Sequence, residues 1–269
     1  MFIRIGYDLL FNLPAPTTML LMLSVHPSRF LSLRGREQTT VEPFVPVTPY
    51  LDAFGNASGR VTAPAGLLRF RNDAVVYDSG QLDEVDPFAR QHQIEELPVD
   101  ALQFLLPSRY CEVDLLKEVA WDLFSRAGTG CELVQAICDW VHGNVTFGYE
   151  FASATKSAMD VYNERKGVCR DFTHLAIAFC RCMNIPARYA TGYLGEIGVP
   201  PAPPGDFSAW FEVYLGDRWW TRDARHNARR IGRVLMATGR DATDVALTTA
   251  FGVAELKQFT VWTDEVDSF

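Results

Sequence analysis

The stretch KGVCRDFTHLAIAFCRCMNIP, residues 166–186, carries the pattern that decides the fold. From Phe172 onward its apolar residues recur at helical spacing, and Pro186 ends the predicted helix. Cys169 then lies in the first turn, where the helix dipole and unpaired backbone N–H groups favour a thiolate. Gly167 permits a sharp entry turn and a close approach of substrate. The cysteine also lies on the apolar stripe of the helix, so a plain core residue is the alternative interpretation.

A second stretch, DFSAWFEVYLGDRWWTRD (residues 206–223), predicts two strands joined by a tight Gly-Asp turn. If pairing continues to the strand ends, Trp210 lies opposite Asp223 and Ser208 lies opposite Arg225. These four residues share one face of the hairpin, and the alternate residues form its core face. Positions 208 and 223 are then spaced for a His–Asp hydrogen bond, but residue 208 is a serine. On the hairpin alone, an ordinary β core with an aspartate that caps a turn is the simpler interpretation.

Together, the motif GVCRDF, the long helix, NIPARYATGYL, a proline-rich loop and DFSAWFEVYLGDRWWTRDARHN resemble the bacterial transglutaminase-like proteins, often called transglutaminase-like cysteine proteases. The resemblance covers roughly residues 115–225. It implies a papain-like core with a Cys–His–Asp triad, in which the cysteine begins a helix that packs on a sheet. Cys169 matches the nucleophile, Asp223 matches the aspartate, and Ser208 stands where the histidine usually precedes Ala-Trp. The implied catalytic positions are Cys169, Asp223 and Ser208, and the implied cleft-lining residues are Trp210, Arg170 and Arg225.

Serine at position 208 removes the expected general base. A hydroxyl group does not accept a proton near neutral pH, and the thiol loses the imidazolium that would stabilise its ionised form. Arg225 could stabilise a thiolate or bind a carboxylate, but it cannot accept a proton. In the predicted register His226 faces the opposite side of the hairpin, unless a bulge after Asp223 turns it inward. His174 points about 140° away from Cys169 around the helix, and we expect it to be structural.

Two functions remain open on this evidence. In the first, Cys169 attacks a peptide bond or a glutamine amide to form a thioester, which water or an amine then resolves. In the second, the chain is a catalytically impaired family member that binds peptides or protein partners in the former active-site cleft. A serine introduced artificially at position 208 is a third explanation of the departure.

The sequence predicts an α+β fold with two domains. Residues 1–112 read as a β-rich antiparallel domain, in which GLLRFRNDAVVYDSG is predicted to form a hairpin around Asn72-Asp73. Beyond them, VDLLKEVAWDLFSRAG and GCELVQAICDWVHG show helical periodicity. Residues 113–269 are therefore predicted to form a papain-like or transglutaminase-like core, with helices packed on an antiparallel sheet.

Composition and charge narrow the classes of partner that we expect for this chain. With 25 basic and 33 acidic residues the net charge is −8, so a nucleic-acid partner is not expected. The apolar run TTMLLMLSV is too short to span a bilayer, and a signal peptide is not evident, so we expect no membrane partner and a cytoplasmic location. The six cysteines lack metal-ligand spacing and no acidic calcium loop is evident, so no metal or cofactor is expected. The expected partner is a peptide or protein substrate.

Overall fold

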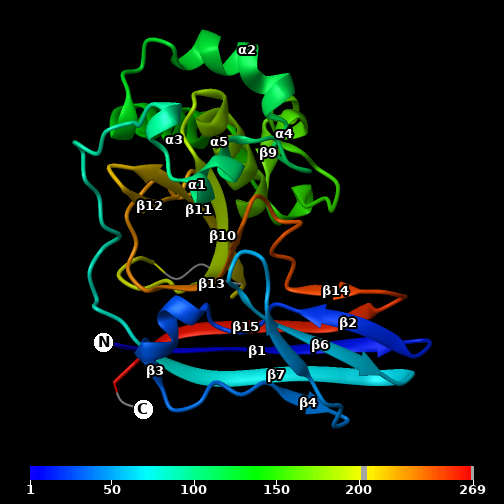
Figure 1. Ribbon diagram of the computed structural model, residues 1–269. Helices are drawn as coiled ribbons and strands as arrows, with labels where there is room; N and C mark the ends of the chain where they lie inside the picture. Colours follow the sequence, from blue (N-terminus) through cyan, green and yellow to red (C-terminus); the bar gives the residue numbers. More distant parts are fainter. Residues whose placement is uncertain (201–204, 268–269) are drawn as a thin grey trace.

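The computed structural model describes residues 1–200 and 205–267. Its helices gather at one end of the molecule, and two sheets of long strands form the other end (Figure 1). The helices are α1 (Val99–Leu102), α2 (Val113–Phe124), α3 (Gly130–Asn144), α4 (Ala158–Glu164) and α5 (Cys169–Cys182). Short 3₁₀ turns are η1 (Pro27–Ser32), η2 (Ile94–Glu96), η3 (Gln103–Leu105) and η4 (Tyr149–Phe151).

The two sheets of long strands contain segments from both halves of the chain. Their strands are β1 (Phe2–Leu13), β2 (Thr17–Leu21), β3 (Leu33–Arg34), β4 (Thr40–Glu42), β5 (Thr48–Leu51), β6 (Ala57–Ala63), β7 (Gly66–Tyr77), β14 (Thr248–Ala250) and β15 (Glu255–Val266). One sheet has the order β15-β1-β7-β3, with β4 also beside β7, and the other has the order β14-β2-β6-β5. All of these pairs are antiparallel, and their buried faces form one apolar cluster.

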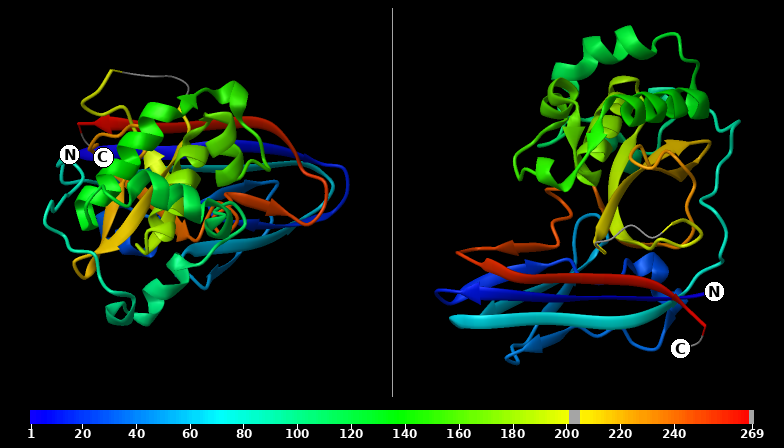
Figure 2. Two further views of the ribbon diagram at one scale, coloured as in Figure 1. Left: turned by 90° about the horizontal axis from the view of Figure 1, so that it is seen from above. Right: turned by 180° about the vertical axis from the view of Figure 1, so that it is seen from behind.

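Strand β15 lies beside β1 although the two are at opposite ends of the chain, as Figures 1 and 2 show. This arrangement ties the last strands to the N-terminal sheet. The division into residues 1–112 and 113–269 stays a prediction. Strands β14 and β15, which belong to the second range, are part of the N-terminal sheets.

The predicted hairpin around Asn72-Asp73 is wrong. Residues 66–77 form one continuous strand, β7, which pairs with β1 along its whole length. Asn72 is buried and donates to Glu37, and Asp73 accepts two hydrogen bonds from Arg4 across the ladder. The tertiary ladder and these side-chain partners override the local turn preference of an Asn-Asp pair.

A further sheet of four strands packs against the helices. Its strands are β10 (Ala187–Leu194), β11 (Phe207–Leu215), β12 (Arg218–Arg222) and β13 (Arg233–Gly239), in the order β12-β11-β10-β13. Helix α5 packs directly on β10 and β11, and α2, α3 and α4 pack against α5. A short parallel pair, β8 (Thr146–Phe147) and β9 (Lys166–Gly167), precedes α5. The α+β fold predicted from the sequence is therefore confirmed.

The β11–β12 hairpin has the predicted register from Leu215↔Arg218 to Phe211↔Arg222. Gly216 and Asp217 have φ values of 54° and 68°, the left-handed pair that a two-residue type I′ turn requires. Strand β12 ends at Arg222, so the expected pairs beyond that point do not form. Within the described residues no helix is long and apolar enough to cross a membrane.

Candidate active site

Cys169 lies in the first turn of α5, as its helical motif predicted, and is the first residue of that helix. It lines a cavity. The preceding residue, Val168, donates its backbone N–H to Asp171 Oδ2 at 2.9 Å, which closes the first turn. The backbone N–H groups of Ala209 and Arg170 favour the ionised form of the Cys169 thiol and act to lower its pKa. Burial nevertheless raises the pKa of the thiol to about 11, against the opposing influence of these N–H groups and a nearby arginine. At neutral pH the resting thiol is therefore neutral.

Gly167 is required by a close contact rather than by an unusual backbone angle. A Cβ at this position would lie 2.5 Å from Asp171 Cβ and 2.6 Å from Asp171 Oδ2. The glycine thus lets the Asp171 carboxylate reach the backbone N–H of Val168, the residue before Cys169.

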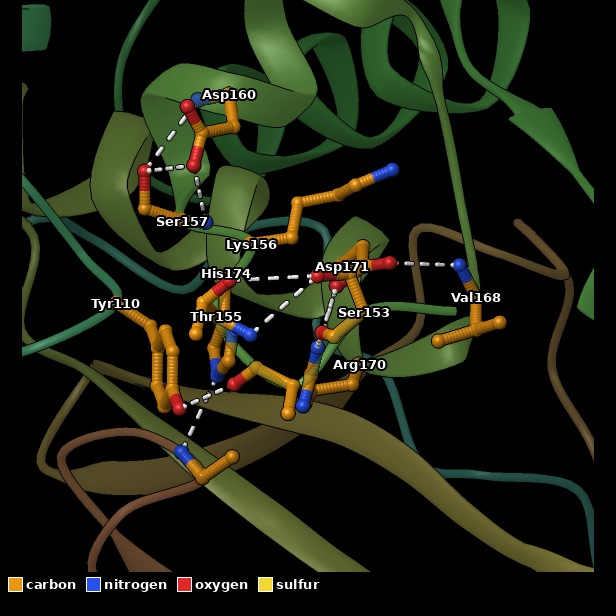
Figure 3. Close-up of polar contacts among 12 residues, drawn as sticks. Tyr110, Ser153, Thr155, Lys156, Ser157, Asp160, Val168, Arg170, Asp171 and His174 are labelled. Carbon is orange, nitrogen blue, oxygen red and sulfur yellow. Dashed lines mark hydrogen bonds and ion pairs between the residues drawn. The ribbon is translucent and has the colours of Figure 1, made fainter. Parts of the chain in front are cut away.

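Arg170 lies beside the cysteine but is held by other contacts (Figure 3). Its guanidinium contacts Asp171 Oδ1 at 3.3 Å, donates to the Ser153 carbonyl and lies over the Tyr110 ring. Arg170 is not among the described residues that line the cavity. Its contacts fasten the segment around Ser153 to the start of α5.

The segment after β12 turns back on itself at Asp223. Asp223 Oδ1 accepts the backbone N–H groups of Arg225 and His226, both at 3.0 Å. The turn brings His226 Nδ1 to within 2.8 Å of Asp223 Oδ2. The expected orientation of His226, away from the site, is therefore wrong. The hydrogen bonds of the Asp223 carboxylate turn the chain after β12. Continued pairing with β11 would have kept this segment extended.

A second partner of Asp223 comes from β13. Arg233, whose side chain is only 6% exposed, contacts Asp223 at 2.8 Å and Asp83 at 2.9 Å, and lies over the Trp210 ring. Burial opposes the ionisation of Asp223, but its hydrogen bond with His226 and the charge of Arg233 hold its pKa well below the usual range. The carboxylate is thus ionised at any pH near neutrality. Sequence reasoning missed Arg233, which lies outside both motifs.

The remaining positions implied by the resemblance differ in their exposure. Ser208 lines the cavity and is 7% exposed, and its Oγ has no hydrogen-bond partner within the described residues. Arg225 also lines the cavity, and its guanidinium lies 3.9 Å from the centre of the Phe147 ring. Trp210 is 2% exposed and is not among the residues that line the cavity.

The cavity lies between the start of α5 and strand β15. Its volume is about 640 Å³, and its wall includes Cys169, Ser208, Arg225, His226 and residues 261–265. The structure thus brings three of the six residues named from the resemblance to one wall, together with a histidine. Asp223 is not among the described residues that line the cavity, but it is hydrogen-bonded to His226.

His174 is structural, as its position on the helix predicted. It is fully buried, stacks on Tyr110, and accepts the backbone N–H of Ala242 on Nε2 at 3.1 Å. Burial lowers its pKa to about 3. Figure 3 shows it on the side of α5 that faces Tyr110. All six cysteines of the chain are free, and within residues 1–200 and 205–267 no group of three or more potential ligands could hold a metal ion.

Known proteins resemble this chain in sequence and in fold. The sequence profile of the Transglutaminase-like superfamily matches residues 117–224. The crystal structure of a "putative cysteine protease" from Cytophaga hutchinsonii is 33% identical, covers 100% of this chain and 92% of its own, and superimposes with a TM-score of 0.84. The chain therefore belongs to the transglutaminase-like superfamily.

Two uncharacterized mycobacterial proteins are more distant relatives. One from Mycobacterium leprae is 27% identical over 148 residues, which is 54% of this chain and 53% of that protein. One from Mycobacterium tuberculosis is 28% identical over 221 residues, which is 72% of this chain and 68% of that protein. The matched part of the chain thus spans about half the length of the M. leprae relative.

Proposed function

We propose that this chain is a cysteine-dependent enzyme that cleaves or transfers amide bonds of peptides. Cys169 is the nucleophile, and His226, oriented by Asp223, is the general base in place of the residue missing at position 208. One observation carries the proposal: His226 Nδ1 lies 2.8 Å from Asp223 Oδ2, and His226 lines the same cavity as Cys169. Membership of a family whose crystallised relative is described as a cysteine protease supports the same reaction class.

The hydrogen bond fixes the role of each imidazole nitrogen. The ionised Asp223 accepts a hydrogen bond from Nδ1–H, which leaves Nε2 of the neutral ring free to accept a proton. Since the thiol is neutral at rest, His226 takes the Sγ proton as the sulfur attacks the amide carbon. The imidazolium then protonates the leaving amine, and a thioester remains on Cys169. Water or a second amine releases the acyl group and restores the thiol.

The region around the sulfur also supplies backbone donors. Because β12 ends opposite Phe211, the first residues of β11 have no β12 partner. The backbone N–H groups of Ala209 and Arg170 both act to lower the pKa of the Cys169 thiol. Donors in this position are suited to the negative charge that develops when the thiol attacks a carbonyl.

The proposal is tested with quenched peptide pools and with ammonia release from glutamine peptides. Cys169→Ala and His226→Gln should each lower kcat/KM by at least about a thousandfold. His26→Gln is the matched control, since His26 is the N-cap residue before η1 and is not among the described residues that line the cavity. It should change kcat/KM by less than about twofold. Full activity of His226→Gln in a protein that still needs Cys169 would contradict His226 as the base.

A second candidate function is peptide binding without catalysis. Two observations favour it: burial raises the pKa of the Cys169 thiol, and Ser208 occupies the usual place of the base. This alternative predicts that parent protein and Cys169→Ala are equally inactive, and that Ser208→His creates amidase activity. The same assay therefore separates the two functions.

A further inference from the structure

The cavity wall carries more negative than positive charge. The acidic residues on it are Glu196, Asp206, Asp264 and Glu265, and the cationic side chain among the described lining residues is Arg225, with His226 beside it. The guanidinium of Arg225 already lies against the Phe147 ring. A ligand that fills this space gains more from a positive than from a negative charge.

Asp206 is an acidic residue of the cavity wall whose charge acts on the Cys169 thiol. It is half-buried, and its charge opposes ionisation of the Cys169 thiol. Burial raises the pKa of Asp206, while the backbone N–H of Phe207 and the charge of Arg225 act in the opposite direction. Within the described residues no cationic side chain forms an ion pair with it. A partly buried carboxylate in this state is stabilised by a cation that the ligand brings.

The other acidic residues form the rim of the cavity near β15. Asp264 and Glu265 are exposed, and neither forms an ion pair within the described part of the chain. Arg4, which lies opposite Asp264 in the β1–β15 ladder, bonds Asp73 instead. Glu196 differs because it contacts Arg230 at 2.9 Å. Two rim carboxylates thus remain available to a cationic group.

Ser208 provides an independent sign that a ligand occupies the cavity. Its side chain is more than nine-tenths buried, and its Oγ lacks a hydrogen-bond partner within the described residues. A buried hydroxyl without a partner is costly, and a polar group of a ligand would satisfy it. Tyr149 on the same wall adds an aromatic ring, which also attracts cations.

We propose that the cavity selects peptides with a lysine or arginine side chain beside the scissile amide. Asp206 pairs with the cationic group, the rim carboxylates Asp264 and Glu265 favour its approach, and Ser208 Oγ hydrogen-bonds the peptide main chain. The part of this inference that names the bond to be cut rests on the proposed function. The binding step itself does not require catalysis.

The test measures binding to the Cys169→Ala protein by fluorescence anisotropy. The probes are labelled peptides that differ at one residue: arginine against citrulline, and lysine against norleucine. In each pair the second side chain has a similar size and no charge. The cationic peptide should bind about tenfold more tightly, and the advantage should fall as salt rises because the rim charges are exposed. Equal affinity for arginine and citrulline peptides would overturn the proposal.

Variants then locate the effect. Asp206→Asn in the same background should remove most of the preference for arginine over citrulline and leave the affinity for citrulline peptides unchanged. Asp122→Asn, at an exposed position on α2, is the matched control and should keep the full preference. A preference for lysine without one for arginine would also contradict the proposal, because it would indicate recognition of a primary amine as acyl acceptor.

Failure of this inference and failure of the proposed function have different signatures. The anisotropy experiment uses a protein without the nucleophile, so it reports charge selectivity whether or not the parent cleaves peptides. Cys169-dependent cleavage without any charge preference would reject the inference alone. A charge preference in a parent protein that shows no Cys169-dependent activity would reject the proposed function alone.

Discussion

Arg233 Nη2 and His226 Nδ1 meet the same carboxylate oxygen, Asp223 Oδ2, each at 2.8 Å. Asp223 therefore divides its negative charge between a permanent cation and a histidine. The permanent cation thus holds the Asp223 carboxylate in place beside the imidazole, and it does not exchange its own proton near neutral pH. Arg233 in turn is held by Asp83, which lies in the segment between the N-terminal sheets and the helices.

Replacing Arg233 should destabilise the fold. Arg233→Met leaves the Asp83 and Asp223 carboxylates without their common partner, and removing one member of a buried pair costs about 3 kcal/mol or more. The free energy of unfolding, measured in urea at pH 7, tests this expectation. Arg4→Met breaks an exposed pair with Asp73 and should cost less than about 1 kcal/mol.

Acid should weaken the fold partly through Asp223. Its pKa is lower in the folded than in the unfolded chain, so its contribution is fully present above the ordinary aspartate pKa of about 4 and is lost as pH falls below it. Between pH 6 and pH 3 the parent should therefore lose stability more steeply than Asp223→Asn. Parallel urea midpoints for the two proteins across this range would rule out the contribution.

The reactivity of Cys169 should report its neutral state. Because burial raises the pKa of the thiol to about 11, its rate of alkylation by iodoacetamide should still be rising at pH 9. Ser208→His would place an imidazole on the same cavity wall, and an imidazolium there should stabilise the thiolate and speed alkylation near pH 6. Mass spectrometry of the modified peptide separates Cys169 from the five other cysteines. A plateau below pH 8 in the parent would show that the thiolate forms more readily than the burial of the sulfur predicts.

Gly167 and Gly143 offer a matched pair for stability. Gly167→Ala places a methyl group against Asp171 and should cost about 1–3 kcal/mol, with a parallel loss of activity because the start of α5 shifts. Gly143 lies in α3 with open space around its Cβ position, so Gly143→Ala should stabilise the helix by up to about 1 kcal/mol. Equal effects of the two substitutions on the urea midpoint would mean that the contact with Asp171 is not restrictive.

Local patterns predicted much of this molecule. The apolar spacing after Phe172 and the stop at Pro186 gave a helix that begins at Cys169, and the Gly-Asp turn fixed the β11–β12 register as far as Arg222. These features depend on neighbours within a few residues, which the sequence displays directly. The hairpin predicted around Asn72-Asp73 failed because pairing with β1, a distant partner, decides that segment.

By itself the sequence determined the family, the α+β class and the place of Cys169 at the start of its helix, because these depend on periodicity and local motifs. Only the tertiary structure decided that His226 lines the same cavity as Cys169. Asp223 turns the chain with its own carboxylate, and Arg233 reaches it from another strand. Such contacts depend on where β12 ends and β13 passes, which no periodicity in the chain encodes.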